Sequence, residues 1–578
     1  MGKDAMKIRK VRVVAVAAAL GGMAATFAGS AVAQPGPTPS TYRQVRFVEQ
    51  DADVQKLTAP AHMTKDATEP ARGFTSPTSM LVHPDNPRIV VAALANLRSR
   101  TCFLAVSRDA GRTWHFSKEP PADSRYPYCT NNNAGVPKAM IAWGRDNTLY
   151  YGLQAYGDGE GPREGRSSIM LARTTNLGDS WQYALVDNNR GKTGIAPSDT
   201  GVTGMAVDTS RDQDVVYVGF SQSFPDAPMD SPLREPHVMV ATSTDGGRTF
   251  ATPVDLNTFQ RPNIEIAGKA YPLLMRTSFG APFLIAREGI VLAVTGPALP
   301  SNDQPPPPPE AGSGLSPGSW YAYPMPQMIA RSTDQGKTWT ITTLGDPILA
   351  GTGSFTGLGW TPHGGDRGTF VAAYAATPAT SPTIALADIV VQRSTDGGLT
   401  WTAPLAIDDD PPELHATSFY PQLNVAPNGR IDVAWQDNRD TKATDFHFDV
   451  RYTYSTDGGA TWAKNIKVND RRLNFNYGIS FNSDLRYPVG VASTDEYVMI
   501  GWADTRHATD LTQTQDAYAT AVQFAPLPAT RNTTAPIIAA IFGGLLVAGL
   551  ILLVVLQSRK RREGQAAPAP PSKEAVRT

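Results

Sequence analysis

Ser243-Thr244-Asp245-Gly246-Gly247-Arg248-Thr249-Phe250 decides the fold of this chain, because the same octapeptide pattern recurs five more times. Every copy keeps a hydroxyl residue, an Asp or Asn two positions later, a Gly, a second hydroxyl residue and an aromatic side chain. The other copies span residues 107–114, 174–181, 332–339, 394–401 and 455–462. Successive copies begin 61 to 89 residues apart. A repeat of this length is typical of solenoids, propellers and arrays.

Each octapeptide is predicted to form a tight turn. A short acidic or amide side chain accepts hydrogen bonds from nearby backbone N–H groups, and glycine supplies a positive φ without steric cost. The flanking hydroxyls satisfy further backbone groups, and the aromatic ring buries a large apolar face between neighbouring sheets. The acidic and amide residues of the six copies are therefore interpreted as structural rather than catalytic. They are Asp109, Asn176, Asp245, Asp334, Asp396 and Asp457.

The octapeptide resembles the Asp-box, or bacterial neuraminidase repeat, of the sialidase-like β-propellers. The resemblance covers most of residues 75–525 and implies an all-β fold of four-stranded blades. Blade-like units begin near residues 78, 136, 202, 281, 354, 419 and 486, so seven blades are favoured over the alternative of six. The last unit has no octapeptide, and we expect its missing strand to come from Tyr42–Val48, which alternates as a strand should.

The composition agrees with many short strands. The 578 residues include 50 Gly and 48 Pro, which argues against a helical bundle, and only 2 Cys, which excludes a disulfide scaffold. Residues 1–33 have the basic start, apolar run and Ala31-Val32-Ala33 site of a secretory signal. Residues 537–556 carry no charge over a length that spans a bilayer, and the basic cluster 559–562 follows.

These ends define the expected organisation of the chain. It comprises a signal peptide (1–33), a propeller ectodomain (34–525), a linker (526–536), a transmembrane helix (537–556) and a basic cytoplasmic tail (557–578). The expected location is therefore the cell membrane, with the ectodomain outside. Residues 1–12 and 559–578 each carry a net charge of +4, so the segment between them carries −9 of the total of −1. An ectodomain this acidic is not expected to bind nucleic acid.

Within a blade, the octapeptide turns join strands three and four, so the opposite face is the expected ligand face. The resemblance implies a sialidase-type site there, with an arginine triad for a sugar carboxylate, a tyrosine nucleophile, a glutamate partner and an aspartate acid. By position, the substrate-binding candidates are Arg98, Arg439, Arg506 and Tyr487. The catalytic candidates are Tyr420 or Tyr487 as nucleophile, Glu413 or Glu265 as its partner, and Asp437 or Asp504 as the acid.

Two readings of the function stay open. One is an exo-α-sialidase-type glycoside hydrolase acting on terminal acidic sugars, and the other is a non-catalytic propeller that binds a glycan or a protein. The Phe/Tyr-Arg-Ile/Leu-Pro tetrapeptide of sialidases is absent, and the corresponding region reads Arg72-Gly73-Phe74. In addition, the Trp-Xaa-Asp-Xaa-Arg pattern at 435–439 and 502–506 is also explained by a repeated ion pair between blades.

The remaining chemistry-bearing residues give few signals. Cys102 and Cys129 flank the first octapeptide and are predicted to form a disulfide in an oxidising compartment. Asp408-Asp409-Asp410 reads either as a solvated acidic loop or as a calcium site. The histidines show no metal-ligand spacing, so no metal and no cofactor are predicted.

Overall fold

The computed structural model describes residues 43–524 with gaps, together with residues 548–559. The longer gaps are 49–55, 66–72, 118–128, 130–138, 157–166, 188–197, 277–282, 304–324, 351–355, 378–386, 411–415, 442–446 and 478–488. Two compact units are present, 1–527 and 528–578, and the first contains every strand.

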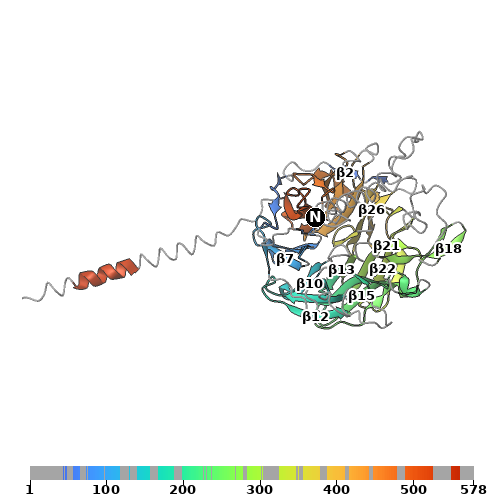
Figure 1. Cartoon of the computed structure of the whole chain (residues 1–578), viewed down its shortest axis with the longest axis horizontal. Coiled ribbons are helices and arrows are strands. Elements are labelled where there is room, and N and C mark those ends of the chain that lie inside the picture. Colours follow the sequence, from blue (N-terminus) through green and yellow to red (C-terminus); the bar gives the residue numbers. More distant parts are fainter. Residues whose placement is uncertain are drawn as a thin grey trace, which may run out of the picture. The chain divides into compact units, whose positions relative to one another are not determined.

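Seven blades follow one another along the first unit, which confirms the predicted blade count. Figure 1 shows the sequence colours passing around this body from blue through green and yellow to orange. The first blade comprises β5 (Ser79–His83), β6 (Asn86–Asn96), β7 (Thr101–Ser107) and β8 (His115–Phe116), and the second comprises β9 (Met140–Trp143), β10 (Leu149–Tyr156), β11 (Ser167–Thr174) and β12 (Gln182–Asp187). The third comprises β13 (Ser198–Asp208), β14 (Val215–Ser223), β15 (His237–Ser243) and β16 (Val254–Asp255). The fourth comprises β20 (Phe283–Arg287), β21 (Ile290–Ala298), β22 (Met328–Ser332) and β23 (Thr340–Thr343), with β19 (Leu274–Arg276) beside β21.

The fifth and sixth blades carry additional short strands, whereas the seventh has three strands from this part of the chain. The fifth blade comprises β25 (Thr356–Thr361), β26 (Thr369–Thr377), β27 (Asp388–Ser394) and β28 (Leu405–Ala406), with β24 (Leu349–Ala350) on β26. The sixth comprises β29 (Ser418–Val425), β30 (Ile431–Asp437), β31 (His447–Ser455) and β33 (Ile466–Lys467), with β34 (Leu473–Asn474) on β31. The seventh comprises β35 (Gly490–Ser493), β36 (Tyr497–Asp504) and β37 (Asp516–Gln523). A hairpin of β17 (Asn263–Ile266) and β18 (Lys269–Pro272) connects the third and fourth blades.

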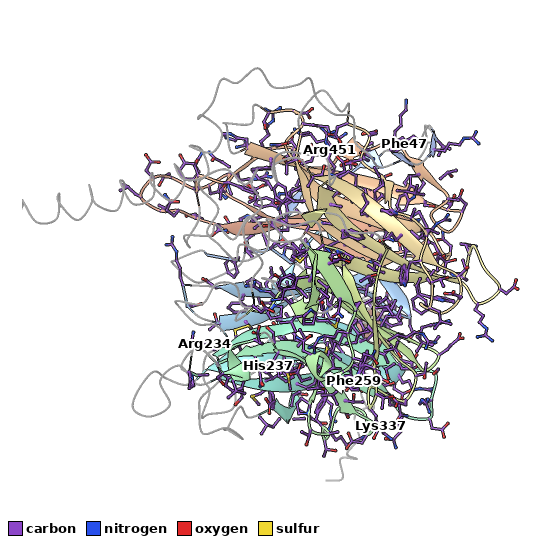
Figure 2. All side chains as sticks on the ribbon, turned by 90° about the vertical axis from the view of Figure 1, so that its right-hand side faces the viewer. Phe47, Arg234, His237, Phe259, Lys337 and Arg451 are labelled. Atoms are coloured by element: carbon purple, nitrogen blue, oxygen red, sulfur yellow. A yellow bond between two sulfur atoms is a disulfide. The ribbon has the colours of Figure 1, made fainter. Side chains whose placement is uncertain are left out.

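The fourth strand of the seventh blade comes from the N-terminal part of the chain, but not from residues 42–48. The strands β3 (Lys56–Leu57) and β4 (Ala61–His62) pair antiparallel with β37 and close the ring. The expected closing segment instead forms β1 (Arg43–Gln44), parallel to β28, and β2 (Arg46–Val48), parallel to β32 (Thr461–Ala463). Figure 2 shows Phe47 of β2 in the same part of the molecule as Arg451 of β31. The prediction of Tyr42–Val48 was therefore wrong, because alternation identifies a strand without identifying the edge it joins.

The core of the propeller lies between the blades. The described apolar side chains form seven buried clusters, and each cluster joins strands of two neighbouring blades. The cluster around Tyr497 and Met499 of β36, for example, also contains Val90 and Leu94 of β6 and so joins the last blade to the first. Since a single sheet cannot bury both of its faces, this stacking is what makes each blade stable.

The octapeptides form the same hydrogen-bonded turn between the third and fourth strands. In the fourth blade, Asp334 Oδ1 accepts from the backbone of Thr338 at 3.0 Å and Oδ2 accepts from the Thr338 hydroxyl at 2.6 Å. Burial alone would raise the pKa of Asp334, but hydrogen bonds from Thr338 and Ser332 outweigh it and lower the pKa to about 2. The carboxylate is thus an ionised acceptor for its own turn.

The glycine at the fifth position of each turn is required by backbone geometry. Gly247 and Gly398 have φ of 71° and 86°, in the left-handed region that glycine adopts readily. A Cβ on Gly398 would lie 2.7 Å from Leu292 of the preceding blade. These turns therefore fit closely against the neighbouring blade, which explains why the octapeptide recurs with so little variation.

The second unit contributes a helix over residues 548–559, whose apolar residues Leu550 to Leu556 are 44–63% exposed. In the parts of the chain that the structure describes, no helix is both long enough and apolar enough to cross a membrane. Residues 537–547 of the expected span lie outside the described residues, as do the expected signal peptide, linker and most of the tail.

Candidate functional site

Two faces of the propeller are distinguished by the loops that they carry. The turn face carries the octapeptide turns and the loops that join the first and second strands of each blade. The open face carries the loops that join the second and third strands and the connections from one blade to the next. Both faces are assembled by the same antiparallel pairing, which places alternate loops at opposite ends of a blade.

On the open face, Arg439 of the sixth blade is surrounded by carboxylates. Its Nε lies 2.7 Å from Asp437 Oδ2, its Nη1 lies 2.5 Å from Asp409 Oδ1, and its Nη2 lies 3.4 Å from Asp410 Oδ1. Asp437 ends β30, whereas Asp409 and Asp410 belong to the connection that arrives from the fifth blade. All three guanidinium nitrogens of Arg439 therefore face protein carboxylates, and the cluster joins two blades.

Burial has a strong effect on the acids of this cluster. Burial raises the pKa of Asp408 well above its usual value, and the nearby Asp388 and Asp410 carboxylates raise it further. Burial likewise raises the pKa of Asp410 to about 6, against the opposing influence of Arg439. Asp410 thus changes its charge near neutral pH. This is the property that a general acid needs.

The equivalent arginine of the seventh blade is also paired. Arg506 Nη2 lies 2.7 Å from Asp504 Oδ2 and 2.7 Å from Asp470 Oδ1, and Asp470 belongs to the connection from the sixth blade. The guanidinium carbon lies 3.9 Å from the centre of the Tyr518 ring. Trp502 Nε1 donates to Asp504 at 3.0 Å. The Trp-Xaa-Asp-Xaa-Arg pattern therefore forms an ion cluster between blades in both places.

The other open-face candidates that the structure describes differ from these two arginines in their surroundings. Arg98 is exposed and donates to the backbone carbonyls of Thr512 and Gln513, so its hydrogen-bond partners differ from those of Arg439 and Arg506. Tyr420 is 9% exposed and has a φ of 58°, a strained value for a tyrosine. Glu265 is exposed on the β17–β18 hairpin. Glu413 and Tyr487 lie outside the described residues.

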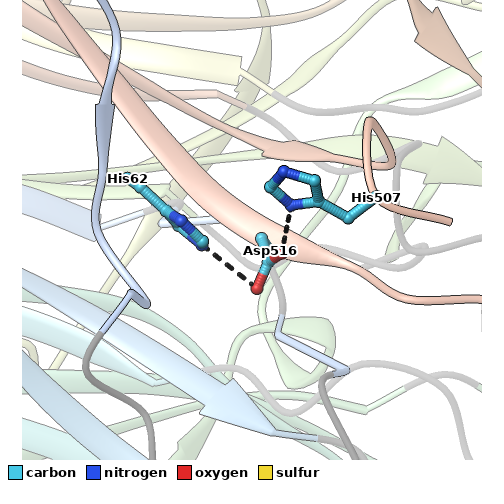
Figure 3. Close-up of side chains that lie close together, drawn as sticks. All are labelled: His62, His507 and Asp516. Atoms are coloured by element: carbon cyan, nitrogen blue, oxygen red, sulfur yellow. Dashed lines mark hydrogen bonds and ion pairs between the residues drawn. The ribbon is translucent and has the colours of Figure 1, made fainter.

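A group that the sequence did not indicate lies beside the seventh-blade cluster. His62 of β4, His507 of the loop after β36 and Asp516 of β37 place one nitrogen or oxygen atom each within 4.8 Å of the others. Figure 3 shows the two imidazole rings on either side of the Asp516 carboxylate. The pKa of Asp516, which burial would raise, is lowered to about 2 by His62, His507 and Thr64, whose polar groups face the carboxylate.

A pocket of about 360 Å³ lies on the turn face, between the second and third blades. Three arginines line it: Arg145 from the loop after β9, Arg173 from the end of β11, and Arg248 from the third octapeptide. Arg173 Nη1 donates to the Gly246 carbonyl at 3.0 Å and its Nε donates to Gln182 at 2.9 Å. Burial lowers the pKa of Arg173, and the positive charge of Arg248 lowers it further.

A buried tyrosine and a carboxylate form the inner wall of this pocket. Tyr150 donates to Asp214 Oδ2 at 2.8 Å, and the backbone N–H of Arg145 donates to the same oxygen at 3.0 Å. Burial, followed by the hydrogen bond to Asp214, raises the pKa of Tyr150 far above its usual value. Tyr150 is therefore a neutral hydrogen-bond donor and not a phenolate nucleophile. Asp146 and Asp212 also line the pocket, and both are exposed.

The contact between Arg173 and the next blade recurs elsewhere on the turn face. Arg331 and Arg393 precede the fourth and fifth octapeptides, as Arg173 precedes the second, and they donate to the carbonyls of Gly397 and Gly458. This arginine position therefore links neighbouring blades. Among the three, Arg173 is the one that also lines the pocket between the second and third blades.

The disulfide that the sequence predicts between Cys102 and Cys129 is present, with the Cα atoms 5.9 Å apart. It attaches the segment before the second blade to β7 of the first.

No protein family matches the chain, and no curated protein is similar to it in sequence. Solved structures with a similar arrangement include a Hadza microbial sialidase at 14% identity, which covers 84% of this chain and 98% of its own with a TM-score of 0.41. A polysaccharide lyase, an ulvan lyase, aligns at 13% identity over 77% of this chain and 93% of its own with a TM-score of 0.40. The α-L-arabinofuranosidase of Fusarium graminearum aligns at 12% identity over 81% of this chain and 98% of its own with a TM-score of 0.38. At these scores, any proposal about function depends on the residues of this chain.

The sequence missed both the histidine–aspartate group and the arginine pocket. His62 and His507 are far apart in the chain, so no spacing could indicate them. Arg173 and Arg248 did offer a signal, because each lies in or next to an octapeptide and successive octapeptides belong to neighbouring blades.

Proposed function

We propose that the protein is a propeller that binds acidic glycans without cleaving them, and that the arginine pocket recognises a sugar carboxylate. The observation that carries this proposal is the group of three arginines around one pocket, Arg145, Arg173 and Arg248. The pocket volume of about 360 Å³ is at the lower end of the range for small-molecule sites and suits a single sugar. The resemblance of the octapeptides to those of sialidase-like propellers supports a glycan as the ligand.

The electrostatics of the pocket favour an anion. Burial lowers the pKa of Arg173, repulsion by Arg248 lowers it further, and a carboxylate between the two arginines would relieve this repulsion. Guanidinium groups also match a carboxylate in geometry, because two N–H groups can donate in parallel. The side chains of Ser180 and Gln182 line the same pocket and can bond to sugar hydroxyls. The proposed role is binding because Tyr150, the tyrosine at the pocket, is held in its neutral form.

The proposal is tested by calorimetric titration of the full-length protein with sialyllactose and with lactose. We expect binding of sialyllactose and none of lactose, with an affinity that falls as salt is added. Arg248→Ala should weaken binding about tenfold or more, since it removes a charge-assisted hydrogen bond. Arg112→Ala is the matched control, because each of the two arginines donates from Nη1 to the carbonyl of the aspartate in its own octapeptide, Arg248 to Asp245 and Arg112 to Asp109. Equal losses in both variants, or equal binding of both sugars, would contradict the proposal.

Glycoside hydrolysis on the open face is the second candidate function. The observation that favours it is the pKa of about 6 for Asp410, close to the strained Tyr420 in the sequence of the same blade. Release of a fluorescent aglycone from a sialoside tests this candidate directly. The full-length protein is compared with Asp410→Asn and Arg506→Ala over pH 4–8. If neither variant lowers the rate, the open face does not catalyse the reaction.

We further propose that the propeller is exported and held at the cell surface. Residues 1–33, 537–556 and 559–562 support this location by their composition, and the Cys102–Cys129 disulfide is typical of an oxidising compartment. Cell fractionation provides the test. The protein should sediment with membranes, and deletion of residues 537–578 should release it to the medium; a deletion variant that stays with the membranes would contradict the proposal.

A further inference from the structure

The carboxylate of Asp516 is directed at two imidazole rings. Asp516 is 1% exposed; its Oδ1 lies 3.3 Å from His62 Nε2, and its Oδ2 lies 3.1 Å from His507 Nδ1. Thr64 donates its hydroxyl hydrogen to Oδ1 at 3.0 Å and so fixes the orientation of the carboxylate. Figure 3 shows both contacts.

The two imidazoles are held in place by different means. The His62 ring is stacked on Tyr518, with the ring centres 4.6 Å apart and the planes at 9°. Its Nε2 is buried and has no hydrogen-bond partner of good geometry, although it faces Asp516. His507 is 52% exposed, and its ring centre lies 5.6 Å from that of His62. One ligand position is therefore rigid, and the other is accessible from solvent.

In the sixth blade, the aspartate equivalent to Asp516 forms ion pairs with cationic side chains instead. Asp449 pairs in register with Asp437, as Asp516 pairs with Asp504. The cations at Asp449 are Lys467, 2.8 Å away, and Arg472, 3.5 Å away. Ammonium and guanidinium groups have no lone pair for a metal, whereas a neutral imidazole has one. The seventh blade thus replaces two permanent cations by two potential ligands.

We propose that His62, His507 and Asp516 bind one divalent transition-metal ion of the zinc class. Zinc takes imidazole nitrogen and carboxylate oxygen at about 2.0–2.2 Å in a tetrahedral arrangement, which places neighbouring donor atoms about 3.3 Å apart. The observed separations of 3.1 and 3.3 Å, each to a different oxygen of Asp516, are close to this spacing, and one donor atom of each residue lies within 4.8 Å of the others. Three protein ligands leave the fourth position to water or to a ligand.

The surroundings of the site are compatible with a cation. Arg506 is a charged group near the site; its guanidinium carbon lies 3.9 Å from the centre of the Tyr518 ring, and it is already paired with Asp504 and Asp470. The metal would link β4, the strand that closes the ring, to β37 and to the loop after β36. Because β4 contributes only two residues to the sheet, such a link would strengthen closure of the propeller.

The test is zinc titration of the untagged full-length protein, followed by calorimetry and by elemental analysis after dialysis. We expect one equivalent of zinc per chain and a higher midpoint of thermal unfolding with zinc than with a chelator. His507→Ala should weaken zinc binding at least about 100-fold, since even outer partners of zinc ligands cost 10–100-fold. Its exposed position makes this variant compatible with folding, which circular dichroism checks.

His115→Ala is the matched control, because His115 is an exposed histidine of the first blade outside the group. It should bind zinc as the unmodified protein does. Cobalt offers a second readout, since a tetrahedral site gives visible absorption bands that His507→Ala should abolish. Absence of zinc binding by the unmodified protein, or unchanged binding by His507→Ala, would overturn the proposal.

Discussion

The sixth and seventh blades place two facing aspartates at the same end of the sheet, yet surround them differently. In the sixth blade, Asp437 and Asp449 are neutralised by arginine and lysine side chains. In the seventh, Asp504 is paired with Arg506, but Asp516 faces two histidines, one of which arrives from the N-terminal strand. A repeated sequence pattern therefore gives the same framework in both blades, and residues outside the pattern give each blade its own chemistry.

The comparison of the two blades also distinguishes open-face residues that join blades from residues that are free to have another role. Arg439 and Arg506 match the positions expected of a substrate-binding triad. Both, however, form ion pairs with carboxylates of the connection from the preceding blade. The pattern is thus a joint between blades. The histidines beside it are not needed for that joint, and this is why they attract a functional interpretation.

The largest difference between the two blades should appear when the arginines are removed. Arg439→Met leaves three carboxylates without their cation and should lower the free energy of unfolding by about 3–5 kcal/mol. Arg506→Met should cost about 1–2 kcal/mol, because water can solvate Asp470, which is 45% exposed, and Trp502 still donates to the buried Asp504. Urea unfolding at pH 7 measures both values, and equal losses would show that the two joints are equivalent.

As the pH falls, protonation in the sixth blade should raise the free energy of unfolding before protonation in the seventh blade lowers it. The pKa of Asp410 is raised to about 6, above the unfolded value near 4, so its ionised form destabilises the folded protein. The free energy of unfolding should therefore gain about 2 kcal/mol from this group as the pH falls from about 7 to about 4. Asp410→Asn should remove the gain in a pH series of urea unfolding. A gain that persists in the variant would assign it to another group.

The carboxylate of the seventh blade should act in the opposite direction and at lower pH. The pKa of Asp516 is lowered to about 2, so its ionised form stabilises the folded protein above about pH 4. This contribution, about 1–2 kcal/mol, should disappear as the pH falls from about 4 to about 2. Asp516→Asn should be less stable at pH 7 and should show a smaller loss over that range. Parallel curves for the two proteins would refute this assignment.

The smallest effect should come from making the seventh blade resemble the sixth. His507→Arg supplies a permanent cation next to Asp516, as Lys467 and Arg472 do next to Asp449. Because His507 is half exposed, the free energy of unfolding without zinc should change by no more than about 0.5 kcal/mol. The stabilisation by zinc should be lost. Zinc that still raises the unfolding midpoint of this variant would place the metal elsewhere.

The fold was predictable because its signal is local. Eight residues specify each turn through side-chain acceptors and glycines, and six copies of the turn indicate the blades that contain them. The closing strand was not predictable in the same way. Residues 42–48 alternate more clearly than 56–62, but the unpaired edge of β37 selects the partner, and no pattern in the chain records that choice.

The candidate sites were less predictable, for a related reason. Trp435 to Arg439 and Trp502 to Arg506 stand out because they repeat, and repetition favours a structural role over a unique chemical one. No sequence pattern marks His62, because it faces Asp516 only once β4 has paired with β37. The arginine pocket likewise exists only where the second and third blades meet, since Arg145 and Arg173 come from one blade and Arg248 from the other.

The pairing of β3 and β4 with β37 also sets the order in which the molecule can be completed. Thr58 and Thr520 share a hydrogen bond across 462 residues, so the N-terminal strands β3 and β4 must wait for β37, the last strand of the propeller. Until residue 523 has been made, one face of the first blade and the strands β3 and β4 lack their final neighbours. A circular permutant that joins the end of β37 to the start of β3 through a short linker would remove this wait and should fold faster than the natural order of the chain.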